Sequence, residues 1–168
     1  MYTFQLSLLN HLVFYSVLLL LPSYLLLCLI GHLHLDVSQG LTFHLQCVQQ
    51  NIHQLIIPAI SPDNWPDVLK LAKQPPQQDC KIFPCLGIHP WFLKDLTEEH
   101  LTQLTQLVEV NKADIIAIGE AGIDGVISKE QDNLAQQISF FDYQLALAKQ
   151  SQLPILVHHR RSHAEVIS

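Results

Sequence analysis

The sequence predicts a parallel α/β fold, in which buried strands alternate with amphipathic helices. The first observation is a series of short, nearly continuous apolar runs at 54–60, 81–88, 114–118 and 153–157. Such runs are expected of strands that are covered on both faces. The second observation is that helical stripes separate these runs, which indicates parallel strands joined by crossover helices. Periodicity alone does not distinguish an open sheet from a closed barrel.

The chain begins with a long uncharged stretch, because no Lys, Arg, Asp or Glu precedes Asp36. Residues 12–30 are long enough to span a bilayer. The stretch lacks the basic flank that sets orientation and the small-residue site of a cleaved signal peptide. A membrane segment at 12–30 is therefore not favoured over an unrelated leader or a run buried against other protein. We treat 1–29 as an apolar leader and 30–168 as the domain.

The first strand of the domain is expected to begin near Cys28 and to carry His32 and His34. Side chains alternate between the faces of a strand, so both imidazoles point the same way. Two neutral histidines side by side are half of a metal site. Taken alone, this pair is explained as well by a strand with two hydrogen-bonded histidines.

The later elements follow from apolar spacing and from capping residues. Helices are expected over 38–50 and 65–73, from Thr97 onward, and over 129–150. A loop is expected over 74–79 and the start of a further helix at 162–168. The strand at 114–118 is expected to end there, so that 119–124 form a glycine-rich loop.

Composition limits the function. With 168 residues and 49% apolar content, the chain suits one domain with a substantial core. The net charge of −6 argues against nonspecific binding of nucleic acid through a basic patch. A phosphate substrate would need metal ions and a few placed arginines. The four cysteines form no Cys-x-x-Cys pair, which favours reduced thiols and a cytoplasmic protein.

Polar groups stand where the apolar runs stop. Glu120 follows one run and His158 another, and a mixed His and carboxylate set suits Zn, Mn or similar divalent metals. Two such ions can hold a phosphodiester and activate water between them. Arg160 and Arg161 can bind phosphate, although a surface pair explains either one equally well. His89 is a candidate substrate contact or a histidine that holds the turn after it.

Secondary roles are open for several neighbours. Asp124 and Asp36 can accept backbone hydrogen bonds and so orient the loops after Glu120 and His34. His159 and His163 are candidate additional contacts, although a loop and a helix start account for both.

Four segments together resemble the TatD family of metal-dependent hydrolases and deoxyribonucleases. They are His32-Leu33-His34-Leu35-Asp36, Leu86 to Pro90, Ala117 to Asp124 and Leu153 to Arg161, in this order, with the run Gln144 to Lys149 before the last of them. The resemblance implies an incomplete (β/α)8 TIM-barrel fold, with about five of the eight β/α units, that binds two divalent metal ions (Zn, Mn or Mg) and cleaves phosphodiester bonds in DNA. By the same resemblance His32, His34, Glu120 and His158 are metal ligands, and Glu120 is the catalytic carboxylate. His89 then lies at the substrate mouth and Arg160 contacts phosphate. No stable protein partner is expected.

The chain departs from the family pattern in two respects. Ile30 stands where the family has Asp, with Gly31 for Thr and Leu33 for Cys. The family also takes a further His and an Asp from later strands, beyond Ser168. We therefore expect this polypeptide to be poorly soluble alone and at least about a hundredfold weaker as a nuclease than a full-length relative.

Two other functions remain open on the sequence. The first is an amidohydrolase-like C–N hydrolase, since His-x-His on the first barrel strand is also found in that superfamily. Those enzymes commonly use a lysine to bridge their metals. Here Glu120 fills the corresponding place better, which favours a phosphoesterase. A catalytically impaired fragment or membrane-anchored remnant would explain the apolar start and the missing ligands.

Overall fold

A computed structural model describes residues 15–21, 24–30, 54–73 and 81–167, with the first two segments described as backbone only. The strands are β1 (Tyr15–Leu21), β2 (Tyr24–Ile30), β3 (Gln54–Pro58), β4 (Lys81–Leu86), β5 (Ala117–Asp124) and β6 (Ile155–Arg160). The helices are α2 (Trp65–Ala72), α3 (Glu98–Asn111), α4 (Ile127–Gln131), α5 (Leu134–Ser151) and α6 (His163–Ile167), with 3₁₀ turns η1 (Pro62–Asn64) and η2 (Pro90–Phe92).

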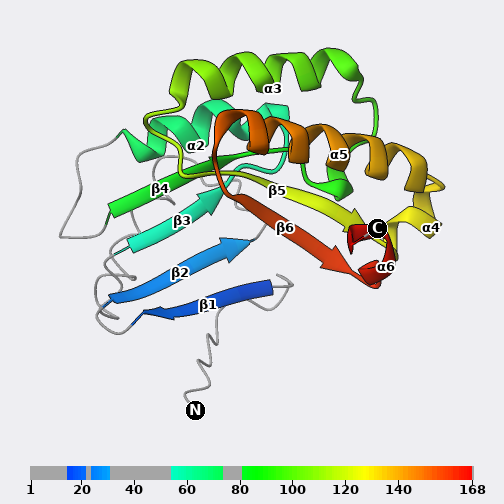
Figure 1. Ribbon diagram of the computed structural model, residues 1–168, viewed down its shortest axis with the longest axis horizontal. Coiled ribbons are helices and arrows are strands. Elements are labelled where there is room, and N and C mark those ends of the chain that lie inside the picture. Colours follow the sequence, from blue (N-terminus) through cyan, green and yellow to red (C-terminus); the bar gives the residue numbers. More distant parts are fainter. Residues whose placement is uncertain (1–14, 22–23, 31–53, 74–80, 168) are drawn as a thin grey trace.

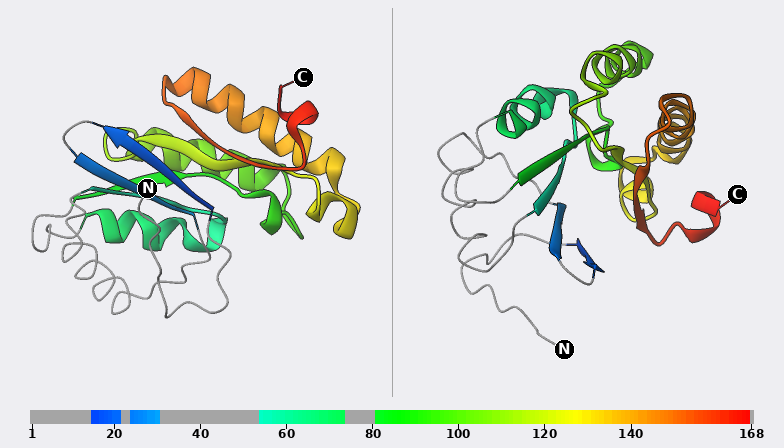
Figure 2. Two further views of the ribbon diagram at one scale, coloured as in Figure 1. Left: turned by 90° about the horizontal axis from the view of Figure 1, so that it is seen from below. Right: turned by 60° about the vertical axis from the view of Figure 1, so that its left-hand side comes forward.

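The described strands form one six-stranded sheet in chain order, β1-β2-β3-β4-β5-β6. Every pair from β2 to β6 is parallel, and β1 alone runs antiparallel to its neighbour. The sheet curls about the strand direction, as Figure 2 shows. Sequential parallel strands with helical crossovers and a curled sheet are features of a (β/α) barrel. The expected fold, an incomplete barrel of this type, is confirmed.

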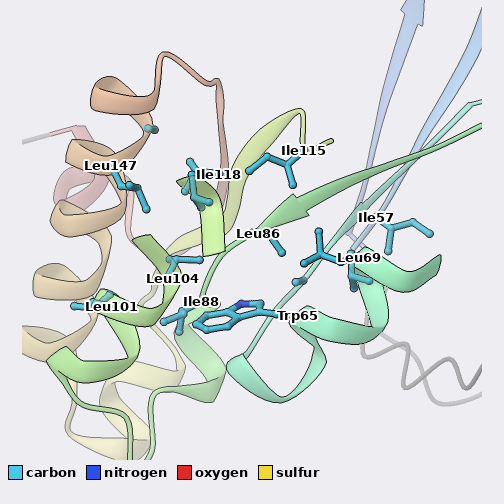
Figure 3. Packing of buried hydrophobic residues seen from close by; sticks show 14 of the residues in the cluster. Ile57, Trp65, Leu69, Leu86, Ile88, Leu101, Leu104, Ile115, Ile118 and Leu147 are labelled. Carbon is cyan, nitrogen blue, oxygen red and sulfur yellow. The ribbon is translucent and has the colours of Figure 1, made fainter. Parts of the chain in front are cut away.

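Helices α2, α3 and α5 lie on the same side of the sheet (Figure 1). Their apolar stripes pack on the sheet in one large cluster, which includes Trp65 of α2, Leu104 of α3, Leu147 of α5 and Ile118 of β5 (Figure 3). Burial of such side chains stabilises each by about 1.5–3 kcal/mol relative to an exposed position. The core therefore lies between helices and sheet, and Glu120 and His158 are carried on the opposite, concave face of the sheet.

The fifth strand carries a bulge that turns Glu120 to the concave face. Ile118 pairs with Ile155 and Ala121 with Val157, so three steps on β5 match two on β6. Ile118 belongs to the core cluster under the helices, and Ala121 packs with Phe141 of α5. In a regular strand Glu120 would share the face of Ile118 and enter this core. The extra residue moves it to the other face.

Two glycines permit this close pairing of β5 and β6. Gly119 and Gly122 have φ angles of 124° and 151°, which side chains disfavour. A Cβ on Gly122 would lie 2.0 Å from the carbonyl oxygen of His158. The expectation that 119–124 form a loop is wrong, because these glycines let the strand continue through Asp124.

Two other predicted boundaries are also corrected. The helix expected over 129–150 is divided into α4 and α5, because Asp132 adopts a left-handed conformation with φ of 50° and ends α4. The strand expected to end at Val157 runs on to Arg160, so that His158 lies within β6. Longer pairing with β5 up to the partners Asp124 and Arg160 explains the extension.

The apolar start contributes two strands to the sheet. β1 and β2 pair over their whole length, from Tyr15 opposite Ile30 to Leu21 opposite Tyr24. None of the helices in the described segments is both long and apolar enough to cross a bilayer. The expected helix at 38–50 and loop at 74–79 lie outside the described residues, and the division between 1–29 and 30–168 stays a prediction.

Candidate metal centre

Three buried side chains meet on the concave face at the carboxyl ends of the strands. His89 follows β4, Glu120 lies on β5 and His158 on β6, and one ligand atom of each falls within 4.8 Å of the others. All three are at most 5% exposed. Parallel strands end at one edge of the sheet, which brings together residues 69 positions apart in the chain, such as His89 and His158. The structure thus unites three of the residues singled out from the sequence.

Glu120 is the charged group at the centre of this cluster. Its Oε1 lies 3.1 Å from Nδ1 of His158 and 3.6 Å from Nε2 of His89. Its Oε2 is buried and has no hydrogen-bond partner among the described residues. Burial raises the pKa of the Glu120 carboxyl, but the imidazoles of His158 and His89 beside it outweigh this effect and hold the pKa below its usual 4.5. Glu120 is therefore a buried carboxylate.

His158 lies between two carboxylates, one at each ring nitrogen. Nδ1 faces Glu120, and Nε2 lies 3.0 Å from Oδ2 of Asp124. Asp124 is fully buried, and its Oδ1 accepts hydrogen bonds from the amides of Val126 and Ile127 at 2.8 and 3.0 Å. Sequence reasoning gave Asp124 the role of orienting the loop after Glu120. Its additional contact with His158 was missed, because it depends on the register of β5 and β6.

His89 is held by the turn that follows it. The backbone amide of Trp91 donates to Nδ1 of His89 at 3.2 Å. A neutral imidazole whose Nδ1 accepts a hydrogen bond carries its proton on Nε2. That Nε2 lies 3.1 Å from Nδ1 of His158. His89 is therefore oriented as a donor toward the cluster, which disfavours it as a metal ligand through Nε2.

Asp124 also receives the side chain of Trp91. The indole Nε1 donates to Oδ2 at 2.7 Å. Burial raises the pKa of the Asp124 carboxyl, but hydrogen bonds from Trp91, Ile127, His158 and Val126 outweigh it and lower the pKa below its usual 3.8. Asp124 is consequently ionised at neutral pH and can only accept hydrogen bonds.

Arg160 lies at the rim of the cluster. Its Nη1 is 3.9 Å from Oδ2 of Asp124, and its side chain is 34% exposed. At this distance the ion pair is weak, and most of the guanidinium remains able to bind another anion. Arg161 is exposed, as are His159 and His163, whose rings approach each other with Nε2 to Nδ1 at 3.3 Å. Within the part of the chain that the structure describes, the side chains of Arg161, His159 and His163 do not contact Glu120 or His158.

Two predicted ligands cannot be compared with this geometry. His32 and His34 lie outside the described residues, and so does Asp36. The predicted roles of His32, His34, Glu120 and His158 as metal ligands, and of His89 and Arg160 as substrate contacts, therefore stay predictions.

The described donors suit a divalent cation. With His158 Nε2 directed at Asp124, Nδ1 of His158 and Oε1 of Glu120, 3.1 Å apart, are two ligand atoms that one cation can reach, and Nε2 of His89 lies 3.1 Å from the same Nδ1. Metals bound at about 2.0–2.1 Å hold neighbouring ligands roughly this far apart. The second Glu120 oxygen adds a further buried acceptor. A histidine nitrogen and a carboxylate form the donor set that Zn, Mn and similar ions accept.

Comparison with known proteins agrees with this geometry. The family model described as TatD related DNase matches residues 31–168. The chain is 33% identical over 120 residues to an uncharacterized metal-dependent hydrolase, YjjV, of Escherichia coli, covering 70% of this chain and 43% of YjjV. It is 36% identical over 78 residues to the 3'-5' ssDNA/RNA exonuclease TatD of Pantoea vagans, covering 46% of this chain and 28% of the relative.

The fold agrees as well. The crystal structure of Escherichia coli YjjV superposes with a TM-score of 0.69 at 30% identity, covering 83% of this chain and 51% of that one. The class defined by fold and site is a (β/α)-barrel protein with a candidate metal centre. This chain belongs to the TatD family. It spans about half the length of the relatives it matches.

Proposed function

We propose that this chain provides the Glu120 and His158 side of the active site in a metal-dependent phosphodiesterase that acts on DNA. The observation that carries the proposal is the buried Glu120 carboxylate. One of its oxygens faces the Nδ1 lone pair of His158, and the other has no partner among the described residues. An unpartnered buried carboxylate oxygen costs about 1–3 kcal/mol or more, so a functional reason for it is expected.

The proposed ligand set is His32, His34, Glu120 and His158, holding two divalent ions of the Zn, Mn or Mg type. Glu120 would hold the ions together with the histidines, because its Oε1 lies beside His158 and its buried Oε2 has no partner among the described residues. When bound, the ions supply a Lewis acid and a water with a lowered pKa. Glu120 is also the proposed catalytic carboxylate, because it is the carboxylate that lies beside both His89 and His158 at the centre of the cluster.

The substrate contacts follow from the donors at the edge of the cluster. His89 offers Nε2–H inside the cluster, since its Nδ1 accepts the Trp91 amide, and this is the donor proposed for a substrate oxygen. Arg160 offers a guanidinium whose one ion pair within the described segments is the 3.9 Å contact with Asp124. Together they suit a phosphate with two oxygens to be bound.

Nucleic acid is the proposed substrate class, with DNA preferred. Support comes from the TatD family membership and from the relative in Pantoea vagans, which is described as a single-stranded DNA and RNA exonuclease. The chain's net charge of −6 means that binding must rely on the site itself. A cytoplasmic location stays a proposal that rests on the cysteine pattern.

Metal analysis of the purified chain tests this proposal. We expect Mn²⁺ or Zn²⁺ to bind, and Glu120→Gln and His158→Ala each to weaken binding by about 10–100-fold. His159→Ala is the matched control, because His159 is the exposed neighbour of His158 on the same strand. Unchanged metal content in both site variants would contradict the proposal. Cleavage of a labelled single-stranded DNA, with RNA in parallel, then tests the substrate.

A further inference from the structure

We propose that Trp91 is a positioning residue that decides, through two separate N–H groups, which ring nitrogen carries the proton in both His89 and His158. Its backbone amide acts directly on His89. Its indole acts on His158 through Asp124. The consequence for the metal centre, which rests on the proposed function, is that His158 can bind metal only through Nδ1 and that His89 stays a donor.

Trp91 acts on His158 through Asp124, whose carboxylate is held by hydrogen bonds at both oxygens. Asp124 Oδ1 accepts the amides of Val126 and Ile127, at 2.8 and 3.0 Å, in the turn after β5. Oδ2 accepts the Trp91 indole at 2.7 Å and lies 3.0 Å from His158 Nε2. Rotation of the carboxylate would break the hydrogen bonds from the two backbone amides and the hydrogen bond from the indole at the same time.

The proton on His158 follows from this arrangement. Since an ionised carboxylate only accepts, the Nε2 that faces Asp124 must carry the hydrogen. In the neutral ring Nδ1 then keeps its lone pair, and it is Nδ1 that faces Glu120 at 3.1 Å. Metal-binding histidines commonly donate their other N–H to a carboxylate in this way.

Trp91 acts on His89 directly, without an intermediate residue. The Trp91 amide donates to His89 Nδ1, so the hydrogen of the neutral ring is on Nε2. The indole ring packs edge-on against the imidazole, with centroids 5.8 Å apart. Trp91 therefore contacts His89 with its ring and amide while its Nε1 bonds Asp124, and one side chain links both histidines of the cluster.

The test compares Trp91→Phe with the wild-type chain. Phenylalanine retains an aromatic ring and the amide but loses the indole N–H to Asp124. Trp65→Phe is the control, because Trp65 also uses its buried Nε1 in one hydrogen bond, to the carbonyl of Gly87 at 2.8 Å, without contacting Asp124. Isotope-labelled histidine reports the protonated nitrogen of each ring by NMR at about pH 8, where an ordinary histidine is neutral.

In the wild-type chain without metal, we expect both His89 and His158 to carry the proton on Nε2. In Trp91→Phe, His89 should keep this form, and His158 should show a mixture of Nε2–H and Nδ1–H. In Trp65→Phe both rings should remain as in the wild type. Zn²⁺ affinity should fall by about tenfold in Trp91→Phe and stay unchanged in Trp65→Phe.

An Nδ1–H form of either histidine in the wild-type chain would overturn the proposal without any variant being needed. So would a Trp91→Phe chain whose His158 proton and Zn²⁺ affinity match the wild type. Because the NMR measurement uses metal-free protein, it decides the role of Trp91 even if the wild-type chain binds no metal. Failure of the metal centre and failure of this inference are thus distinguishable.

Discussion

Gln137 and Gln144 lie two helical turns apart on the buried face of α5, and each bonds the backbone beside a residue of the metal centre. Gln144 accepts from the amide of Ile88 at 2.8 Å and donates to its carbonyl at 3.1 Å, one residue before His89. Gln137 accepts from the amide of Asp124 at 2.8 Å. Both are at most 1% exposed. The helix outside the sheet thus holds in place the backbone that presents the site on its other face.

Replacing Gln144 with leucine should destabilise the chain by about 1–3 kcal/mol, because the amide of Ile88 would be left buried without its acceptor. Urea unfolding measures the change. Gln150→Leu, an exposed position on the same helix, is the control and should change stability by less than about 0.5 kcal/mol. Equal effects of the two substitutions would contradict the role given to Gln144.

Replacing Gly122 with alanine should cost about 2 kcal/mol or more. The added Cβ would meet the carbonyl oxygen of His158 at 2.0 Å, and the φ of 151° is unfavourable for alanine. Thermal unfolding measures the stability, and the increase in stability on adding Zn²⁺ reports whether His158 is still placed to bind metal. For comparison, the exposed helical change Ala146→Gly should cost about 1 kcal/mol. A Gly122→Ala chain as stable as this comparison would contradict the close approach of β5 and β6.

Stability of the metal-free chain should fall in acid because of Glu120 and Asp124. Their folded-state pKa values lie below the usual 4.5 and 3.8, so the carboxylates favour the folded state at pH values above these numbers. This stabilisation is lost as the pH falls through the lowered folded pKa values. Urea unfolding from about pH 7 down to about pH 2, with a chelator present at the upper end, should show the loss. Asp124→Asn should flatten the dependence, and an unchanged slope would show that Asp124 titrates normally.

Replacing Arg160 with alanine should weaken binding of a single-stranded oligonucleotide by about tenfold, through loss of one charged contact to phosphate. Fluorescence anisotropy with a catalytically inactive Glu120→Gln background measures the affinity. Lys149→Ala removes the same charge from an exposed position on α5 and should leave the affinity nearly unchanged. A similar loss in both would mean that only net charge matters.

Much of the fold was predictable from local patterns. The apolar runs at 54–60 and 81–88 placed β3 and β4 within two residues, and the stripe after Thr97 placed α3. The errors occurred where a neighbouring strand overrides local pattern. Gly119 and Gly122 resemble a loop in sequence, yet pairing with β6 keeps them in a strand.

For the site, the sequence by itself determined that Glu120 and His158 follow apolar runs and therefore end near one edge of a parallel sheet. It also determined the family, through motifs that keep their order along the chain. Only the tertiary structure decided the face on which Glu120 lies, because a bulge is defined by the register of two strands. Only the tertiary structure also decided that Trp91 and Asp124 hold His158. Hydrogen bonds between residues 33 or 34 positions apart depend on how the strand ends and the η2 turn meet in space, and no local sequence pattern records that.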